Sequence, residues 1–362
     1  MDWMRRGVPQ MGWGTRWTAI GLVYAIVLVG IALIFCQGDW FVFVNLGREM
    51  IVEDGIRWRQ GTDRQFAYLI ASAPLNAVPE LDVPAYRLQR ILYPALAWLA
   101  ALGQAACVPV TLVLVNVLAL GLGTGAFAIL LKQEDAPFFI PSLFFLWFGT
   151  SQALLFDLNE ITAMCLALWA LVFFSRGQLG ASQILFGLGA LAKDLAFLFA
   201  IPAVIRLLRL KDYKVAVQFA MVSAAPYVIW MMVLRLLLGT WSFDAPATRF
   251  SLIPLGGLSW LDPSTPLTIG LLVLPGLMCA FWALQHLDDV YAWATLFSFA
   301  YLIFLPRYSL AAYAVFRLAI PLVLASALLL ARLRHKRWLV YCAAAWSSTA
   351  VLTLAVAVTN PE

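Results

Sequence analysis

Residues 18–36 read TAIGLVYAIVLVGIALIFC, nineteen consecutive residues without a charge. At a helical rise of about 1.5 Å per residue the stretch is about 28 Å long, close to the hydrocarbon core of a bilayer at about 30 Å. Trp17 and Trp40 flank it, as tryptophan does at membrane interfaces. Arginines precede it, so the positive-inside rule predicts a cytoplasmic N-terminus. No small-residue cleavage site follows, and we expect this membrane-spanning helix to be retained.

The whole chain has the same apolar character. Of 362 residues, 63% are hydrophobic and 12% charged, with a mean hydropathy of +0.88, whereas soluble domains are about 45–50% apolar and about 25% charged. A soluble domain and a disordered chain are therefore excluded. A net charge of +5 is too dilute for a nucleic-acid partner. The five cysteines and two histidines have no ligand spacing, which argues against haem, zinc and copper chemistry.

One polar segment interrupts the apolar chain. Residues 37–90 hold seven of the 19 acidic and six of the 24 basic residues. Because they follow the first membrane helix, we expect an extracytoplasmic loop made of juxtamembrane amphipathic helices, for example at 41–52. A loop of this length usually carries function. We treat 1–362 as a single all-α transmembrane domain.

The direction of the later helices follows from charge. Apolar stretches lie at 91–106, 108–131, 138–156, 161–175, 183–205, 215–238, 267–284, 290–305, 318–332 and 338–358. The connectors that hold Lys132, Arg176, residues 206–214 and residues 332–337 are rich in Lys and Arg and should all be cytoplasmic. Stretch 91–106 must then stay on the outer side as a juxtamembrane or re-entrant helix. Stretch 183–205 is predicted to enter and return as two half-helices, with a single crossing as the alternative.

The most informative residues lie in the polar loop, in GTDRQFAY at 61–68 and LDVPAYRLQRILYP at 81–94. If Asp82 caps a helix that starts near Pro84, then Arg87 and Arg90 lie on one face, with Tyr86 one turn from Arg90. Two guanidinium groups at headgroup depth suit a phosphate or diphosphate. The alternative is that both arginines only extend toward lipid headgroups.

Three further groups are candidates for chemistry. Asp63 is a possible general base for an acceptor hydroxyl, or else it pairs with Arg64 or caps a short helix. Lys193 and Asp194 lie inside an apolar run, where charge is costly, and predict a polar pocket. Asp157 and Glu160 either orient an acceptor or hold Mg²⁺ or Ca²⁺, or they only favour a helix N-terminus.

These motifs resemble the GT-C class of integral-membrane glycosyltransferases, and in particular a bacterial group that reads G-Y-D-G-Q-F-Y-Y and then Y-R-Y-Q-R-I-L-Y-P in its first outer loop. The matching residues are Gly61, Asp63, Gln65, Phe66, Tyr68, Tyr86, Arg87, Gln89, Arg90, Ile91, Leu92, Tyr93 and Pro94. A later D-L-T-E element of the group is similar to Asp157-Leu-Asn-Glu160, and Lys193-Asp194 resembles its basic-acidic pair. A weaker likeness covers residues 316–321.

The resemblance implies a bundle of 10–12 helices in the bacterial cytoplasmic membrane, with its active face extracytoplasmic, serving the cell envelope. It implies inverting transfer of a sugar from a polyprenyl-phosphate donor to a glycan, lipid or protein acceptor. Asp63 would be the catalytic base. Donor and phosphate contacts would come from Gln65, Tyr68, Tyr86, Arg87, Gln89, Arg90, Lys193 and Asp194, with Asp157 and Glu160 orienting the acceptor. No definite cofactor is predicted, and Mg²⁺ or Ca²⁺ is the one candidate.

The sequence departs from that pattern at three positions. Arg64 stands where the group has glycine, Ala67 where it has an aromatic residue, and Phe156 where an arginine often precedes D-L-T-E. These departures favour a second hypothesis, a non-catalytic membrane subunit of this fold that binds lipid or a partner protein. A secondary transporter is disfavoured, because internal repeats are absent and only Lys193 and Asp194 approach the membrane midplane.

Overall fold

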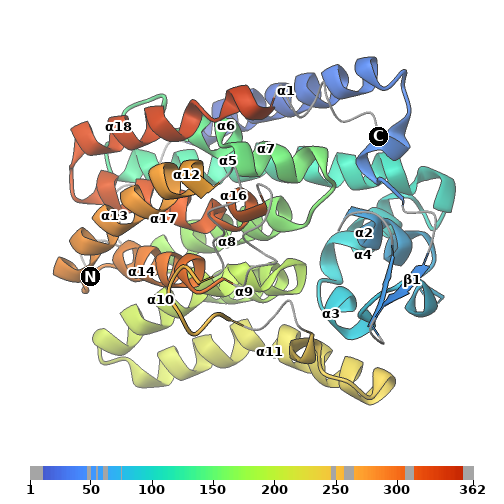
Figure 1. The fold of residues 1–362 in the computed structure, drawn as a ribbon. Coiled ribbons are helices and arrows are strands. Elements are labelled where there is room, and N and C mark those ends of the chain that lie inside the picture. The colour runs from blue at the N-terminus through green and yellow to red at the C-terminus, as the bar shows by residue number, and fades with distance from the viewer. Residues whose placement is uncertain are drawn as a thin grey trace.

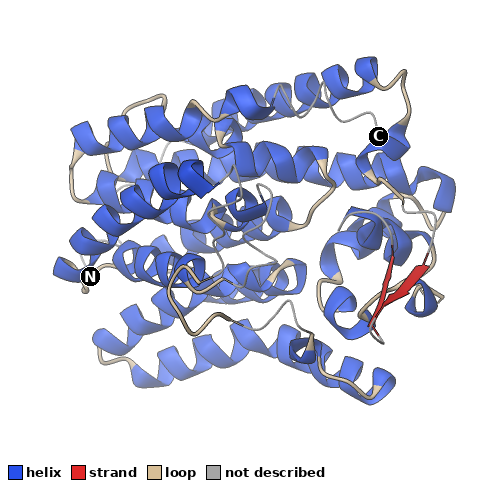
Figure 2. Cartoon of the chain, in the orientation of Figure 1, coloured by secondary structure: helices blue, strands red, loops and turns tan. Residues whose placement is uncertain are grey.

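The computed structural model describes residues 11–46, 50–53, 56–59, 64–74, 76–245, 250–256, 265–305 and 314–353. Within these ranges the chain is helical, apart from one two-stranded antiparallel hairpin (Figure 2). The helices up to the middle of the chain are α1 (Met11–Phe35), α2 (Arg64–Ser72), α3 (Pro84–Leu88), α4 (Leu92–Ala100), α5 (Val108–Gln133), α6 (Leu143–Leu146), α7 (Phe148–Leu155), α8 (Glu160–Ser175) and α9 (Leu179–Ala192). The later helices are α10 (Phe197–Arg209), α11 (Tyr213–Leu238), α12 (Thr265–Thr268), α13 (Leu274–Gln285), α14 (Val290–Ile303), α16 (Ala314–Leu318), α17 (Ile320–Arg332) and α18 (Lys336–Ser347).

Four helical segments in the described part are long and apolar enough to cross a membrane. They are Gly12–Phe35, Ala105–Gln133, Tyr213–Leu238 and Thr265–Gln285. The last one joins α12 to α13 through a short π-helical turn, Ile269–Val273. Shorter apolar helices, among them α8, α9, α14 and α17, fill the interior between them. The described part of the chain is therefore a helical bundle with four candidate membrane-spanning helices, which is consistent with its apolar composition.

The helices lie roughly side by side (Figure 1). Neighbours along one path are α1 with α5, α5 with α8, α8 with α9, and α9 with α11. A second group, α13, α14 and α17, packs together and meets the first through α10 and α14. The core between these helices is made of Leu, Ala and Phe side chains that are almost fully buried.

The predicted basic connectors meet at one end of the bundle. One open hollow, with about 620 Å³ of empty space that includes open solvent, is lined by Gln133 at the end of α5, Ser175 at the end of α8, Arg206 in α10 and Arg332 at the end of α17. We call this the basic end. Since α9 begins and α10 finishes at this same end, the chain reverses between them at Lys193. The break predicted inside 183–205 is thus confirmed, and α9 and α10 run in opposite directions (Figure 1).

The opposite end carries the polar first loop, and we call it the loop end. There α2, α3, α4 and the hairpin of β1 (Met50–Glu53) with β2 (Ile56–Arg59) form a separate layer beside the bundle (Figure 1). The amphipathic helix predicted at 41–52 is wrong in the described part, because Trp40–Phe43 is a short 3₁₀ helix and residues 50–53 form β1. Strand residues Ile51, Val52 and Ile56 are β-branched and favour this extended pairing.

Two further stretches differ from simple crossings. Helix α4 has nine residues, too short to span a bilayer, in agreement with the juxtamembrane prediction. The apolar stretch 138–156 is divided into α6 and α7 at Trp147, whose backbone is extended. The backbone amide of Phe148, released at this break, donates to the Thr349 hydroxyl at 3.0 Å inside the protein. The Trp147 indole donates to the Phe316 carbonyl and so ties the break to α16.

Candidate functional site

Helix α3 positions the two loop arginines. It starts at Pro84 as predicted, but its N-cap is Val83, and Asp82 makes no helix cap. Asp82 instead accepts hydrogen bonds from Arg87 Nε at 2.8 Å and from Nη2 at 2.7 Å. The carboxylate prefers this guanidinium because a bidentate charged pair is stronger than a cap bond. Arg87 is thereby held in one orientation, with its guanidinium 3.8 Å from the centre of the Phe66 ring.

Arg90, which follows the end of α3, is fixed by a residue of that helix. Its Nη2 donates to the Tyr86 hydroxyl at 2.8 Å, and its guanidinium lies 4.6 Å from the centre of that ring. The contact between Tyr86 and Arg90 is the one predicted from their spacing. Helix α3 is attached to α11, because the Trp230 indole donates to the Leu88 carbonyl. The Tyr227 hydroxyl of α11 also lies 3.3 Å from the side-chain oxygen of the buried Gln89.

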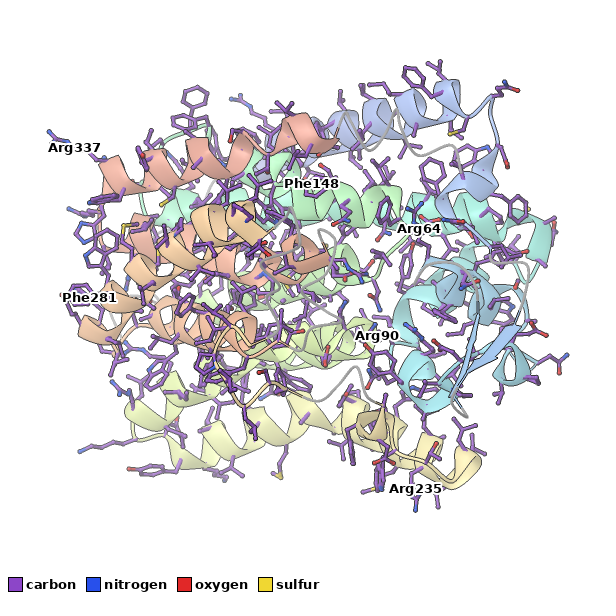
Figure 3. All side chains as sticks on the ribbon, viewed as in Figure 1. Arg64, Arg90, Phe148, Arg235, Phe281 and Arg337 are labelled. Carbon is purple, nitrogen blue, oxygen red and sulfur yellow. The ribbon has the colours of Figure 1, made fainter. Side chains whose placement is uncertain are left out.

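A cleft with about 420 Å³ of empty space lies where this layer faces the bundle. Its described lining comes from α2, α3, α4, α16 and the turn after α7, namely Phe66, Ala67, Ile70, Arg87, Arg90, Tyr93, Pro94, Asp157, Leu158, Asn159 and Arg317. We call it the arginine cleft, because three arginines and one carboxyl group are its charged lining residues in the described part. Figure 3 places Arg64 and Arg90 in the same region, between the bundle and the first-loop layer.

Asp157 forms part of the wall of the cleft. The residue is fully buried, and neither carboxyl oxygen has a hydrogen-bond partner among the described residues. Burial raises the pKa of this carboxyl well above its usual value, and the positive charge of Arg64 opposes that rise. An unsatisfied buried polar group costs about 1–3 kcal/mol, so such groups are uncommon outside functional sites.

Arg64 and Phe156, two of the departures from the glycosyltransferase pattern, contact each other. The Arg64 guanidinium lies 3.4 Å from the centre of the Phe156 ring. Its Nη1 also donates a long hydrogen bond, 3.4 Å, to the Val42 carbonyl. Burial lowers the pKa of Arg64 to about 10, which leaves it charged at neutral pH. A guanidinium therefore lies near Asp157, although α2 supplies it in place of residue 156.

Glu160 and Lys193 form a buried ion pair behind the cleft. Lys193 Nζ donates to Glu160 Oε1 at 2.5 Å, and Arg317 Nη1 lies 3.5 Å from the same oxygen. The pocket predicted around Lys193 and Asp194 is therefore built differently, since the partner of Lys193 comes from α8. Asp194 is half-buried and interacts electrostatically with Tyr227 and Tyr301.

Several predicted residues lie away from the described lining. Gln65 is fully buried, and Tyr68 packs edge-on against Phe41 at 5.7 Å between ring centres. Lys193, Asp194 and Glu160 also stay outside the lining set. Asp63, the predicted base, lies outside the described residues, directly before α2.

The sequence interpretation missed Arg317 and Asn159 as lining residues of the cleft. Arg317 falls inside residues 316–321, where the motif likeness is weak, and Asn159 lies within the Asp157–Glu160 motif without a proposed role. The Asn159 amide donates to the Ala192 carbonyl at 2.9 Å and so ties the cleft wall to the end of α9. Only long-range packing brings α16 to this position.

In the described ranges, no group of three or more His, Cys, Asp or Glu residues is arranged to hold a metal ion. Comparison with models of protein families, with curated proteins and with solved structures finds no match. What the site does must therefore be inferred from its own geometry.

Proposed function

We propose that this protein is a membrane glycosyltransferase of the GT-C type, which transfers a sugar from a polyprenyl-phosphate donor to an acceptor on the extracytoplasmic side. The observation that carries the proposal is the arginine cleft, in which Arg87, Arg90 and Arg317 line one hollow at the edge of an apolar bundle. Guanidinium groups match phosphate oxygens in shape and charge. A lipid donor confined to the bilayer reaches such a cleft without leaving the membrane.

In the proposed reaction, the arginines hold the phosphate of the donor. Asp63 removes the proton from an acceptor hydroxyl, and the acceptor oxygen attacks the anomeric carbon from the side opposite the phosphate. The bond between that carbon and the phosphate oxygen breaks, and its electron pair stays on the phosphate, where the arginines stabilise the negative charge. The product is inverted at the anomeric centre, and polyprenyl phosphate is released.

The arrangement of charges supports this assignment in two ways. Arg87 and Arg90 are held rigid by Asp82 and Tyr86, which lowers the entropy lost when a phosphate binds. The basic connectors meet at the end opposite the cleft, and the positive-inside rule assigns that end to the cytoplasm. The cleft then faces the outer leaflet, where a lipid-linked sugar is available without a soluble nucleotide donor.

The test is direct turnover. Purified protein is incubated with polyprenyl-phosphate hexoses and pentoses and an envelope extract as acceptor, and release of free polyprenyl phosphate is measured. We expect release with at least one sugar, a loss of about 10²-fold or more in Asp63→Asn, as general-base catalysis predicts, and weaker donor binding in Arg90→Gln. If the native protein binds the lipid donors but releases polyprenyl phosphate from none of them, the result would instead support a non-catalytic lipid-binding subunit. That is the alternative that Arg64 and Phe156 favour.

A further inference from the structure

In the described part of the chain the charge of Arg64 acts on the carboxyl group of Asp157, but no hydrogen bond satisfies the two carboxyl oxygens. Asp157 follows α7 with φ of +47°, in the left-handed region. The turn explains why a β-branched or bulky residue is absent, because Asn, Asp and Gly tolerate this conformation. It does not explain a carboxyl, since Asn or Gly meets the same backbone requirement without burying an ionisable group. The two oxygens, without a described hydrogen-bond partner, thus point to a group that arrives from outside the chain.

The charges around Asp157 restrict what that group is. Arg87, Arg90 and Arg317 line the same cleft, and Arg64 interacts electrostatically with the carboxyl itself. An amine or a metal cation would be repelled by four arginines. An anion placed directly against Asp157 would be repelled by the carboxylate when Asp157 is ionised. A neutral hydrogen-bond donor meets neither obstacle, and a hydroxyl attached to the same molecule as a phosphate satisfies both parts of the cleft.

We infer that Asp157 binds hydroxyl groups of a sugar whose phosphate is held by the arginines, so that the ligand of the cleft is a glycosyl phosphate and not a plain lipid phosphate. This inference rests on the proposed function for the phosphate and adds the sugar contact. Asp157 accepts hydrogen bonds from the sugar hydroxyls, which supplies the partners that its oxygens lack. A site built to bond a hydroxyl discriminates strongly against a ligand that has none, because the buried group is then left unpaired.

The experiment compares ligands that differ only in the sugar. Decyl phosphate and the decyl phosphates of glucose, galactose and mannose are titrated into the purified full-length protein in detergent. We expect at least one glycosyl compound to bind about tenfold more tightly than decyl phosphate, equivalent to about 1.4 kcal/mol. Asp157→Asn should reduce this preference to about twofold while the affinity for decyl phosphate stays within about twofold of the native value.

Two further variants sharpen the comparison. Asp157→Gly also accepts the positive φ and removes the side chain, so it should lose the preference in the same way and covers the case in which Asp157→Asn folds poorly. Arg317→Gln should lower the binding affinity of every ligand by a similar factor, because Arg317 contacts the phosphate that all of them share. Equal binding of all four ligands to the native protein, or a preference that survives in both Asp157 variants, overturns the inference. Absence of binding by every ligand overturns it together with the phosphate site of the proposed function.

Discussion

Asp157 is the residue at which local backbone, burial and charge combine. The left-handed turn after α7 admits it, and the packing of α7 against α8 and α16 removes it from water. Arg64 supplies a positive charge that acts on its carboxyl. Sequence reasoning found this residue through the Asp157-Leu-Asn-Glu160 motif, but it did not predict that Asp157 and Glu160 serve different purposes. Glu160 forms an ion pair with Lys193, whereas the Asp157 carboxyl lines the cleft.

The raised pKa of Asp157 has a consequence for stability. An acid whose pKa is higher in the folded state than in the unfolded chain binds its proton more tightly when folded, so its stabilising effect is complete below the unfolded value of about 3.9 and is lost as pH rises through the raised pKa. We therefore expect the thermal stability of Asp157→Asn, relative to the native protein, to increase from pH 4 upward, by at most about 1.4 kcal/mol per pH unit.

Thermal unfolding of both proteins in detergent, measured in steps between pH 4 and pH 8, checks this expectation. Asp135→Asn is a suitable control, because that residue also has a positive φ but is exposed. A constant difference in melting temperature between native protein and Asp157→Asn across the range would mean that Asp157 has an ordinary pKa.

At the scale of elements, the cleft depends on how α7 approaches α16. A Cβ atom placed on Gly149 would lie 2.0 Å from the Phe316 carbonyl oxygen, which also accepts the hydrogen bond from the Trp147 indole. Only glycine allows this approach. Because Arg317 follows Phe316 directly, the same contact sets the position of the third cleft arginine.

Gly149→Ala should therefore separate the two helices. We expect a loss of about 3 kcal/mol in unfolding free energy, the upper part of the range for overpacked cores, and weaker phosphate binding through displaced Arg317. Gly180→Ala is the matched control, because nothing lies within 4 Å of a Cβ at that helical position. Alanine there should raise the free energy of unfolding by about 0.5–1 kcal/mol. Melting temperatures of the two variants in detergent distinguish the outcomes, and equal values would refute the role of Gly149.

For the whole molecule, an ion-pair network closes the basic end. Arg332 Nη1 lies 3.1 Å from both Glu134 oxygens and its Nε lies 3.1 Å from Asp289 Oδ2, which joins α17 to the end of α5 and the start of α14. Arg332→Ala removes charged hydrogen bonds worth about 1.5–3 kcal/mol and should lower the melting temperature. Arg337→Ala, an exposed change at the same end, should leave it unchanged. Similar melting temperatures for the two variants would show that the network contributes little.

The proposed orientation also has a whole-molecule test. Cys107 is exposed and belongs to the loop end, Cys36 is partly exposed at the end of α1, and the other three cysteines are buried. In spheroplasts, a membrane-impermeant maleimide should label the native protein mainly at Cys107. In a variant without Cys36 and Cys107, Arg337→Cys should react only after permeabilisation. Labelling of that cysteine in intact spheroplasts would reverse the orientation and remove the extracytoplasmic site.

Much of the architecture is already readable in the chain. The free energy of placing each residue in lipid or water depends on local composition. It explains the apolar runs, their breaks at Lys193 and in residues 91–106, and the clustering of basic connectors. The contact between Tyr86 and Arg90 follows from helical spacing alone. The hairpin at residues 50–59 was missed because amphipathic helix and strand patterns are hard to separate over so few residues.

The partners of the charged groups depended on the tertiary structure. The contacts of Lys193 with Glu160, of Arg64 with Phe156, and of Arg317 with the cleft are choices among several possible pairs. An electrostatic contact in a buried site is governed by distances of a few ångströms between elements that are far apart in the chain, and those distances arise only when the helices pack. Hydropathy acts on each segment separately, which is why composition indicates membrane helices and leaves the pairing of their charges open.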